Sequence, residues 1–495
     1  GLLLNSARSF YLRSAHEDEQ TFLIILSRMR PRRLQLNPHL FTYGGAYVYS
    51  LGAWLALCAA LRVAALHASM APYLADPSLM ASLYFSGRLF TVAAYLGCAL
   101  LLLRIGRRHL GERAGLLAAL FFLFAPIVVV QAHVMKNHML WAFLFLWTLD
   151  LSLDALAAGG LAAYAAAGAV SGLTVGAFLA AWPACLVVGA ACALRIFALR
   201  KPAAAELKGL AAAAAASAAA FFASNPYWLL DWRSARAEMK VLSGWGTFDL
   251  SHPFLFLGHS FVHAVTWPLF ALIAAGAAWA AAKGRREPAL WLCLFAFLSG
   301  LAMMTTVGDV TVVRQARYFL GFLAVGQLLA GRAAADLLRW KGGRPWIAGA
   351  LALLLAYLAS AGAAYAYNFH EDSGARSTHV ESGEWIEAHV PAGASIGLLR
   401  LPQPSNAPYF RYDRYDLRFI ESAGLFATLP ASQLPEYVAV TSPDYDDRPA
   451  MEPALSRYEL AAEFDRSSLF PWFRIDPTAT TADPEIDIYR LKRAP

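Results

Sequence analysis

Asp18 and Glu19 form a carboxylate pair whose types could do acid-base chemistry. They follow His16 in a polar amino-terminal segment, ahead of a long series of apolar stretches. Neighbouring residues on a helix point about 100° apart, so the two carboxylates cannot aim at one atom. One of them can act as a general base while the other orients a partner or binds a cation. A solvated acidic loop is the alternative interpretation, and both stay open.

A second polar cluster occupies residues 131–138, between two strongly apolar stretches. It contains His133, Lys136 and His138, a density that anchoring at a membrane boundary does not require. A lysine and imidazoles can stabilise a phosphate through charged hydrogen bonds. The two histidines could also bind a metal, although their separation does not place them on one helical face. We expect phosphate contact from Lys136 and substrate contacts from the histidines, and a divalent cation stays an open alternative.

Arginines at the ends of apolar stretches form a third group. Arg88 lies near the start of one stretch, and Arg314 and Arg317 directly precede another, followed by Tyr318. Arginine at a membrane boundary is a functional hypothesis by default, with snorkelling toward lipid headgroups as the alternative. We expect these three arginines to bind the phosphate of a lipid-linked donor and Tyr318 to contact the substrate.

The segment that begins at Ser224 continues with Asn225, Pro226, Tyr227 and Trp228. Aromatic residues at the end of a span are the ordinary interfacial belt, and asparagine before proline forms turns. We retain Asn225 and Tyr227 as candidate substrate-binding residues.

The composition identifies the class of protein that must position these residues. The chain has 495 residues, of which 58% are hydrophobic and 15% are charged. Soluble domains have about 25% charged residues, and runs of about 20 apolar residues indicate membrane spans. The five cysteines all lie in apolar stretches, where we expect small core residues rather than a disulfide framework. The chain is therefore predicted to be a polytopic α-helical membrane protein.

Charge divides the chain and orients its spans. Residues 1–366 carry 29 Lys and Arg against 14 Asp and Glu, whereas residues 367–495 carry 12 against 20. The basic clusters occupy alternate connections at 104–113, 200–208, 283–286 and 339–344, which the positive-inside rule places in the cytoplasm. The excess of positive charge thus reflects membrane orientation, and no nucleic acid partner is expected. The predicted spans are 85–103, 114–131, 139–157, 162–179, 182–199, 207–223, 258–282, 289–305, 318–336 and 346–365.

Residues 44–66 form a further apolar stretch, which we interpret as a helix at the outer membrane interface. A full crossing would put the cluster at 104–113 on the wrong side, and the tyrosines at 43, 47 and 49 suit a wet boundary. A true span remains the alternative. The opening Gly1-Leu2-Leu3-Leu4 resembles the end of a preceding first span. Residues 5–80 are then the first external loop, and every candidate site residue faces outward.

These motifs occur in an order that resembles one known family. The order is similar to that of the protein O-mannosyltransferase and aminoarabinose transferase group of membrane glycosyltransferases, which have the GT-C fold. The resemblance covers residues 8–495 and depends on order more than on any one motif. Besides the Asp-Glu pair, it rests on Asn37-Pro38-His39, Ser86-Gly87-Arg88, Arg107-Arg108-His109, Ala125-Pro126, Ser171-Gly172-Leu173, Asn225-Pro226-Tyr227 and Ala316-Arg317-Tyr318.

The resemblance implies an inverting transfer of one sugar from a polyprenyl-phosphate carrier to a hydroxyl acceptor. It implies that Asp18 is the catalytic base and Glu19 its supporting partner, and that Arg88 and Arg317 bind the donor phosphate. The family often has an aspartate where this chain has His138. That departure makes Lys136 more attractive as a phosphate contact.

Residues 367–495 are predicted to form a small extracytoplasmic α/β domain, joined to a transmembrane domain at 1–366. A helical pattern covers 381–390, and short strands are expected at 396–401, 437–441, 458–464 and 486–491. Alanine richness indicates a bacterial inner membrane with a periplasmic active site. The acceptor could be a protein, a lipid or a glycan. A transporter of a lipid or anionic solute is the alternative function, although such a protein needs polar groups or broken helices near mid-membrane.

Overall fold

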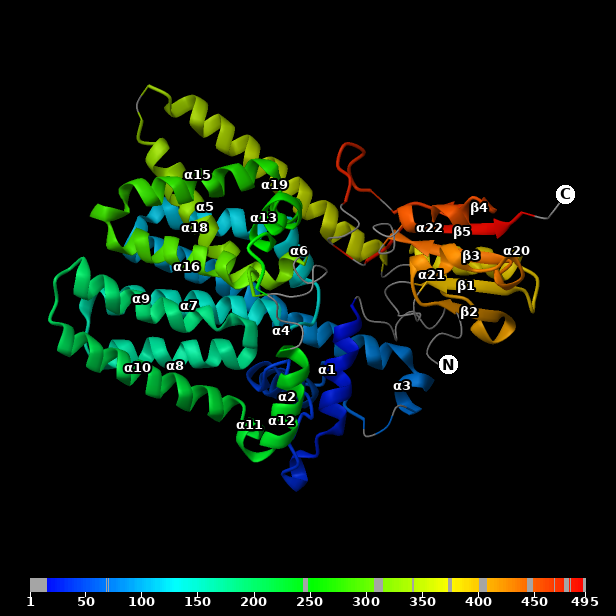
Figure 1. Cartoon of the computed structure of the whole chain (residues 1–495), viewed down its shortest axis with the longest axis horizontal. Helices are drawn as coiled ribbons and strands as arrows, with labels where there is room; N and C mark the ends of the chain where they lie inside the picture. The colour runs from blue at the N-terminus through cyan, green and yellow to red at the C-terminus, as the bar shows by residue number, and fades with distance from the viewer. Residues whose placement is uncertain are drawn as a thin grey trace. The chain divides into compact units, whose positions relative to one another are not determined.

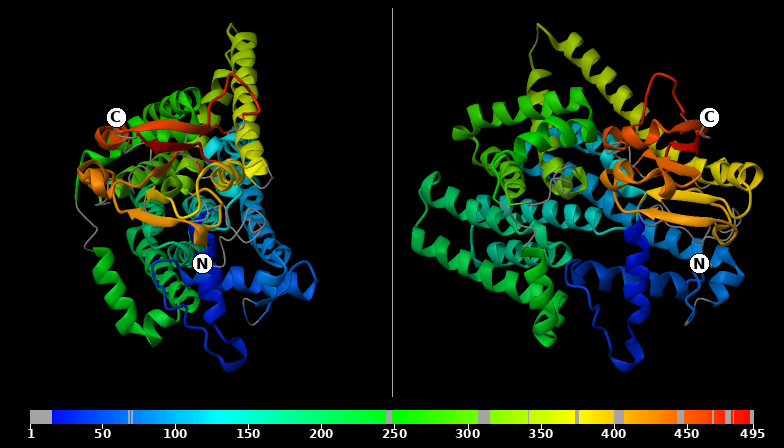
Figure 2. Two further views of the ribbon diagram at one scale, coloured as in Figure 1. Left: turned by 90° about the vertical axis from the view of Figure 1, so that its right-hand side faces the viewer. Right: turned by 45° about the vertical axis from the view of Figure 1, so that its right-hand side comes forward.

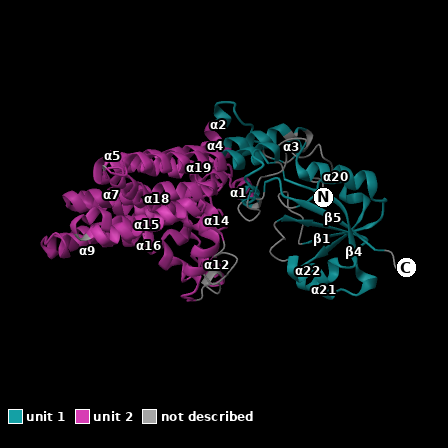
Figure 3. Cartoon of the chain, turned by 90° about the horizontal axis from the view of Figure 1, so that it is seen from above, with its two compact units in different colours: residues 1–21, 58–86, 363–495 teal, residues 22–57, 87–362 magenta. Residues whose placement is uncertain are grey.

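The computed structural model of the chain forms two compact units, shown in Figure 3. Unit 2 comprises residues 22–57 and 87–362, and unit 1 comprises residues 1–21, 58–86 and 363–495. The predicted boundary at residue 366 remains a prediction. The structure describes residues 16–67, 69, 71–243, 248–306, 315–340, 342–372, 376–399, 407–442, 448–466, 468–475, 480 and 482–492. Arg314 and the opening Gly1-Leu2-Leu3-Leu4 lie outside these ranges.

Unit 2 is a bundle of helices that run side by side (Figure 1). Among the described residues, six helical segments are long and apolar enough to cross a membrane, or seven if one bent pair is a single span, and four shorter apolar helices accompany them. An apolar helix or bent pair lies in each of the ten predicted spans, but only six or seven of them have the length of a span. Residues 44–66 contain a helix, and its position at the membrane interface remains a prediction. In chain order the apolar helices are α2 (Gly45–Ala60), α4 (Pro77–Ile105), α5 (Glu112–Phe124), α6 (Pro126–Ala132), α7 (His138–Ala158), α8 (Leu161–Ala177), α9 (Pro183–Phe197), α10 (Ala203–Ser224), α15 (Trp267–Lys283), α16 (Pro288–Met304), α18 (Leu320–Leu337) and α19 (Arg344–Asp372).

Two predicted spans are broken where the backbone cannot continue a regular helix. Pro126 opens α6, and α5 and α6 meet at an angle of 65°. Proline has no backbone N–H and clashes with the preceding turn, which favours a break there. The predicted span at 258–282 is interrupted at Thr266, whose φ is 76°. This part of the chain folds as α13 (His252–Leu255), which precedes the predicted span, a wide turn at 256–261, α14 (Val262–Val265) and α15.

Small residues let the helices approach closely. A Cβ added to Gly168 or Gly172 of α8 would collide with backbone atoms of Ala213 or Ser217 of α10. Membrane helices pack through such small residues because the bilayer gives no hydrophobic drive for helices to associate. Four of the five cysteines are buried, as expected of core residues, but Cys185 on α9 is exposed. Tyr47 also departs from expectation, since it is fully buried rather than at a wet boundary.

The predicted basic connections gather at one end of unit 2, where acids meet them. Arg104 Nε lies 2.7 Å from Asp150 Oδ2 on α7, and Arg195 Nε on α9 lies 2.8 Å from Glu206 Oε2 on α10. Arg332 on α18 donates to Glu287 and also to the Leu110 carbonyl. Most of these groups sit at the ends of spans, so the network ties adjacent helices together. The connections predicted to face outward meet at the opposite end, described below.

Unit 1 contains a five-stranded mixed sheet with the order β2-β1-β3-β5-β4. β1 pairs in parallel with β2 and with the central β3, and β5 pairs antiparallel with β3 and β4. The predicted helix and four strands are confirmed, and β2 was not predicted. The elements are α20 (Thr378–His389), β1 (Ser395–Leu399), β2 (Asp416–Ile420), α21 (Ala423–Thr428), β3 (Tyr437–Thr441), α22 (Arg448–Leu455), β4 (Tyr458–Phe464) and β5 (Ile486–Leu491).

Apolar side chains cover both faces of this sheet. Ile386 of α20 packs with Ile396 and Ile488 on one face, and Met451 of α22 packs with Val438 on the other. A sheet covered on both faces has buried strands, which explains why β1 is buried at all five positions.

Candidate functional site

Asn225 joins the ends of three helices at the end of unit 2 opposite the basic network. Its Oδ1 accepts a hydrogen bond of 2.6 Å from the Gly45 N–H at the start of α2. Its Nδ2 donates to the Gly176 carbonyl near the end of α8 at 3.2 Å. Asn225 itself caps the end of α10 and is buried. A Cβ at Gly44 would collide with the Gly176 backbone, so the close approach requires glycine.

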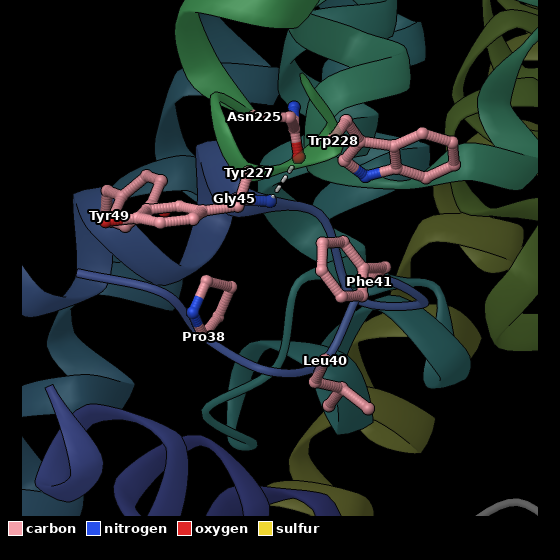
Figure 4. A pocket seen from close by; sticks show the side chains of 8 residues that line it. All are labelled: Pro38, Leu40, Phe41, Gly45, Tyr49, Asn225, Tyr227 and Trp228. Carbon is pink, nitrogen blue, oxygen red and sulfur yellow. Dashed lines mark hydrogen bonds between the residues drawn. The ribbon is translucent and has the colours of Figure 1, made fainter. Parts of the chain in front are cut away.

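A small pocket lies beside this junction (Figure 4). It has a free volume of about 10 Å³, which is room for about one water molecule. It is too small for a sugar, so we interpret it as a packing defect of the junction rather than a substrate site. Its lining includes Tyr49, Asn225 and Tyr227, together with Pro38, Leu40, Phe41, Gly45 and Trp228.

Acidic and hydroxyl groups of residues 227–238 accept hydrogen bonds from residues 36–42. The Tyr227 hydroxyl accepts from the Leu36 N–H at 3.2 Å. Asp231 accepts from Asn37 Nδ2 at 2.7 Å, and this bond, with one from Ser234, lowers the pKa of the Asp231 carboxyl. Glu238 accepts from the N–H groups of residues 41 and 42 and from the residue 42 hydroxyl. Tyr227 and Asn225 therefore have structural contacts, and substrate binding by either remains a prediction.

Phe178 is the centre of an aromatic cluster at the same end. Its ring stacks on Tyr318 with centroids 5.8 Å apart and lies 5.6 Å from the ring of His138. Trp141 also stacks on Phe178, with ring centroids 5.4 Å apart. The backbone of Tyr43 pairs with that of Phe178 in an isolated β-bridge. Two residues predicted to contact the substrate, His138 and Tyr318, are thus brought together, 5.3 Å apart between ring centroids.

The loop between α6 and α7 carries the predicted phosphate contact. Lys136 is 2% exposed and the next residue, Asn137, is fully buried and donates to the Ala177 carbonyl at 3.1 Å. A buried ammonium group is costly unless a charged or polar group accepts its hydrogen bonds. Contact of Lys136 with the donor phosphate remains a prediction.

His133 and Arg88 lie near each other beside this loop. His133 Nδ1 donates to the Val129 carbonyl at 2.8 Å, which leaves Nε2 as the acceptor nitrogen of the neutral ring. Burial lowers the pKa of His133, and the nearby Arg88 charge lowers it further. Gly87 brings α4 against the loop, since a Cβ there would collide with the Met135 side chain. The structure thus places Arg88 near His133, and their role in binding an anion remains a prediction.

Arg317 lies at the start of the segment that leads into α18. It is half-buried, and its guanidinium lies 5.4 Å from the ring centre of Tyr318. Through Tyr318, Arg317 contacts the aromatic cluster of Phe178. Arg314, which was predicted to bind the same phosphate, lies outside the described residues.

The predicted catalytic acids open α1 (Glu17–Arg28), and their positions belong to unit 1. His16 caps this helix, because its Nδ1 accepts from the Asp18 N–H at 3.1 Å. Glu19 is fully buried and Asp18 is partly exposed. Both carboxyl side chains thus lie in the first turn of α1.

Sequence reasoning missed Phe178, Trp141, Asn137 and Glu238. Phe178 and Trp141 read as ordinary apolar residues of spans, and no sequence signal distinguishes them. Asn137 lies within the polar loop that the sequence did single out, and Glu238 is an isolated acid in an otherwise basic segment. Asn137 and Glu238 could therefore have been identified from the sequence. Among the described residues, no group of three or more His, Cys, Asp or Glu side chains could hold a metal ion.

Comparisons with known proteins identify the fold. No protein-family model and no curated protein sequence matches the chain. The structure of the oligosaccharyltransferase AglB from Archaeoglobus fulgidus, in complex with an inhibitory peptide and a dolichol-phosphate, matches 92% of this chain and 70% of its own with a TM-score of 0.50 and 14% identity. ArnT from Cupriavidus metallidurans bound to undecaprenyl phosphate matches 97% of this chain and 93% of its own, with a TM-score of 0.47 and 12% identity.

A third match is the arabinofuranosyltransferase AftD from mycobacteria, which matches 90% of this chain and 35% of its own with a TM-score of 0.42 and 15% identity. The AglB match, which covers most of the chain, shows that the chain has the fold of that oligosaccharyltransferase. This agrees with the fold class that the sequence predicted, a polytopic helical protein with a small C-terminal domain.

Proposed function

We propose that the chain transfers one sugar from a polyprenyl-phosphate donor to a hydroxyl acceptor with inversion at the sugar carbon. The observation that carries the proposal is the burial of Lys136, at 2% exposure, at the end of a GT-C bundle where Arg88 and His133 also lie. AglB, whose fold this chain shares, was solved with a dolichol-phosphate. A phosphate attached to a membrane-embedded chain is the anion best suited to this position.

Cations at this end would act on the leaving group. As the bond between the sugar carbon and the phosphate oxygen breaks, negative charge grows on the phosphate. A preorganised donor in a dry site stabilises such charge, and one well-placed donor contributes about 3 kcal/mol. We assign this role to Lys136, Arg88 and Arg317, with Arg314 as a further candidate.

The acceptor hydroxyl would be activated by Asp18. The carboxylate takes the hydroxyl proton while the hydroxyl oxygen forms the new bond to the sugar carbon, and general-base catalysis of this kind contributes about 10²–10⁴-fold. Asp18 lies in the first turn of α1, where the helix dipole is favourable to negative charge. Glu19 supports it from its buried position. His16, His133, His138 and Tyr318 are proposed to contact the sugar or the acceptor.

The acceptor is a protein, a lipid or a glycan, and the proposed site opens on the extracytoplasmic side of a bacterial inner membrane. This orientation rests on the four basic connections, which lie at the end of unit 2 opposite Asn225 and Lys136.

Binding of undecaprenyl phosphate to protein in nanodiscs tests the phosphate site. Lys136→Met should weaken binding at least about tenfold, because it removes a buried cation from the anion. Lys208→Met is the matched control, since Lys208 is exposed and lies near the other end of α10. Equal affinity of Lys136→Met and wild type would remove Lys136 from the site. Vesicle uptake of the intact lipid without sugar release would instead favour the transporter.

A further inference from the structure

The turn after α1 carries an unusual concentration of arginine. Residues 28–33 contain four arginines, and no acidic residue lies between Glu19 and Asp76. Arg28, Arg30 and Arg33 are exposed. The following Leu34 has a positive φ of 56°, held by its N–H on the Pro31 carbonyl, and is 82% exposed. The turn therefore presents positive charge and an apolar tip together.

Helix α12 (Trp232–Ser243) presents a similar surface. Arg233 and Arg236 are exposed, whereas Ala235 is buried against the protein. Trp232 is 54% exposed, and the Arg236 guanidinium lies 5.2 Å from its ring centre. The preceding α11 (Tyr227–Leu230) ends with the exposed Leu229 and Leu230.

The two segments form one surface. The Leu36 N–H bonds to the Tyr227 hydroxyl, and Asn37 bonds to Asp231. Asp231 and Glu238, the acids of the 227–243 segment, are both engaged by the 37–42 segment. The exposed charges that remain on these two segments are therefore positive.

This surface lies at the end of unit 2 where the positive-inside rule disfavours arginine, because the four basic connections lie at the other end. Figure 2 shows the turn after α1 and the α11–α12 segment at the same lower edge of the molecule. In Figure 1, α12 runs across the direction of α7 and α9. An element that crosses the direction of the spans at their end lies along the membrane plane, at the depth of the lipid headgroups.

We propose that this surface binds anionic phospholipid headgroups of the adjacent leaflet. We call it the lateral basic surface and define it by Arg28, Arg30, Arg33, Arg233 and Arg236. The guanidinium groups contact lipid phosphates, while Leu34, Leu229, Leu230 and Trp232 enter the acyl boundary. Tryptophan and leucine beside arginine are the composition of an interfacial anchor. The inference does not depend on the proposed transfer reaction.

A fluorescent probe at residue 34 tests this proposal. In a Cys185→Ala background, Leu34→Cys is labelled, since Cys185 is the only one of the five native cysteines that is exposed. The protein is placed in nanodiscs of phosphatidylcholine and phosphatidylglycerol, and quenching by spin-labelled phosphatidylglycerol is compared with quenching by spin-labelled phosphatidylcholine. We expect a preference for the anionic lipid. Arg28→Gln, Arg30→Gln and Arg33→Gln together should lower this preference at least about fivefold, the effect of one cation near a charged surface.

The matched control is the triple variant Arg200→Gln, Lys201→Gln and Lys208→Gln, which removes three exposed cations near the other end of the bundle. It should leave the preference at residue 34 unchanged, and near-equal thermal unfolding of both variants shows that both fold. Equal quenching by the two lipids in the wild type overturns the proposal. Weak quenching by either lipid, with binding of soluble heparin at the same arginines, also overturns it in favour of a soluble acidic partner.

Discussion

Replacing Asn225 with alanine should unlock the junction of α2, α8 and α10. The substitution removes the hydrogen bond of Oδ1 with the Gly45 N–H and that of Nδ2 with the Gly176 carbonyl, at 2.6 and 3.2 Å. Both partners are main-chain groups of buried residues, Gly45 and Gly176. An unsatisfied buried polar group costs about 1–3 kcal/mol. The two together predict a loss of about 2–6 kcal/mol from the local stability of the junction.

Hydrogen exchange measures this loss where it occurs. If the junction opens locally, a loss of about 2 kcal/mol raises amide exchange about thirtyfold, so exchange at the start of α2 should rise at least that much. Local exchange is the better readout because membrane proteins often unfold irreversibly. Unit 1 should be unaffected, and its sheet amides serve as an internal reference.

Asn37→Ala is the matched control. It removes one hydrogen bond of the same kind, to Asp231 at 2.7 Å, but Asn37 is only half-buried and water can replace its partner. We expect about 1 kcal/mol or less from this change. If Asn225→Ala raises exchange no more than Asn37→Ala does, the junction is not held by Asn225 and this reasoning is wrong.

Three further predictions concern other parts of the bundle. Gly87→Ala should displace Met135 and its loop and cost about 1–3 kcal/mol in thermal unfolding, whereas Gly189→Ala, with open space at its Cβ, should cost nothing. Because the pKa of His133 is lowered in the fold, the unfolded chain binds more protons below about pH 6.5. Apparent Tm should therefore fall from pH 7 to 5.5, less steeply in His133→Gln, and equal slopes would contradict this. Arg195→Met should leave the buried Glu206 carboxylate without its counter-charge, at a cost of about 3–5 kcal/mol in thermal unfolding. Adding Glu206→Gln to this variant should recover part of the loss.

The sequence could predict where the apolar helices lie and in what order, because apolar length carries that information locally; it predicted ten spans, whereas six or seven of the described helices have the length of a span. It also predicted the strands of the small domain, whose apolar residues are bounded by Pro, Asp and Ser. It did not predict β2 (Asp416–Ile420), although Leu417 and Phe419 alternate with Asp416 and Arg418 at the period of a strand. The break at Thr266 was hidden, since threonine is not a residue that requires a positive φ.

The candidate site was predictable in its charged members and not in its framework. Lys136, His133 and Arg88 stood out because charge is rare in apolar surroundings. The contacts of Phe178 and Asn225 join segments that are far apart in the sequence, and no local pattern encodes such pairing. The glycines at 44, 87 and 176 have the same character, since each is required by a neighbour that only the fold brings near.

The most direct test of the proposed transfer is consumption of a panel of polyprenyl-phosphate sugars in nanodiscs, followed by mass spectrometry. Wild-type protein should release polyprenyl phosphate from one donor, and Asp18→Asn should abolish this release while keeping wild-type affinity for undecaprenyl phosphate. Glu112→Gln, which changes an exposed acid at the other end of the bundle, should retain full activity. Release by Asp18→Asn at the wild-type rate would contradict the assignment of Asp18 as the base. If the wild type consumes no donor with protein, lipid and glycan acceptors supplied, the proposed transfer itself is contradicted.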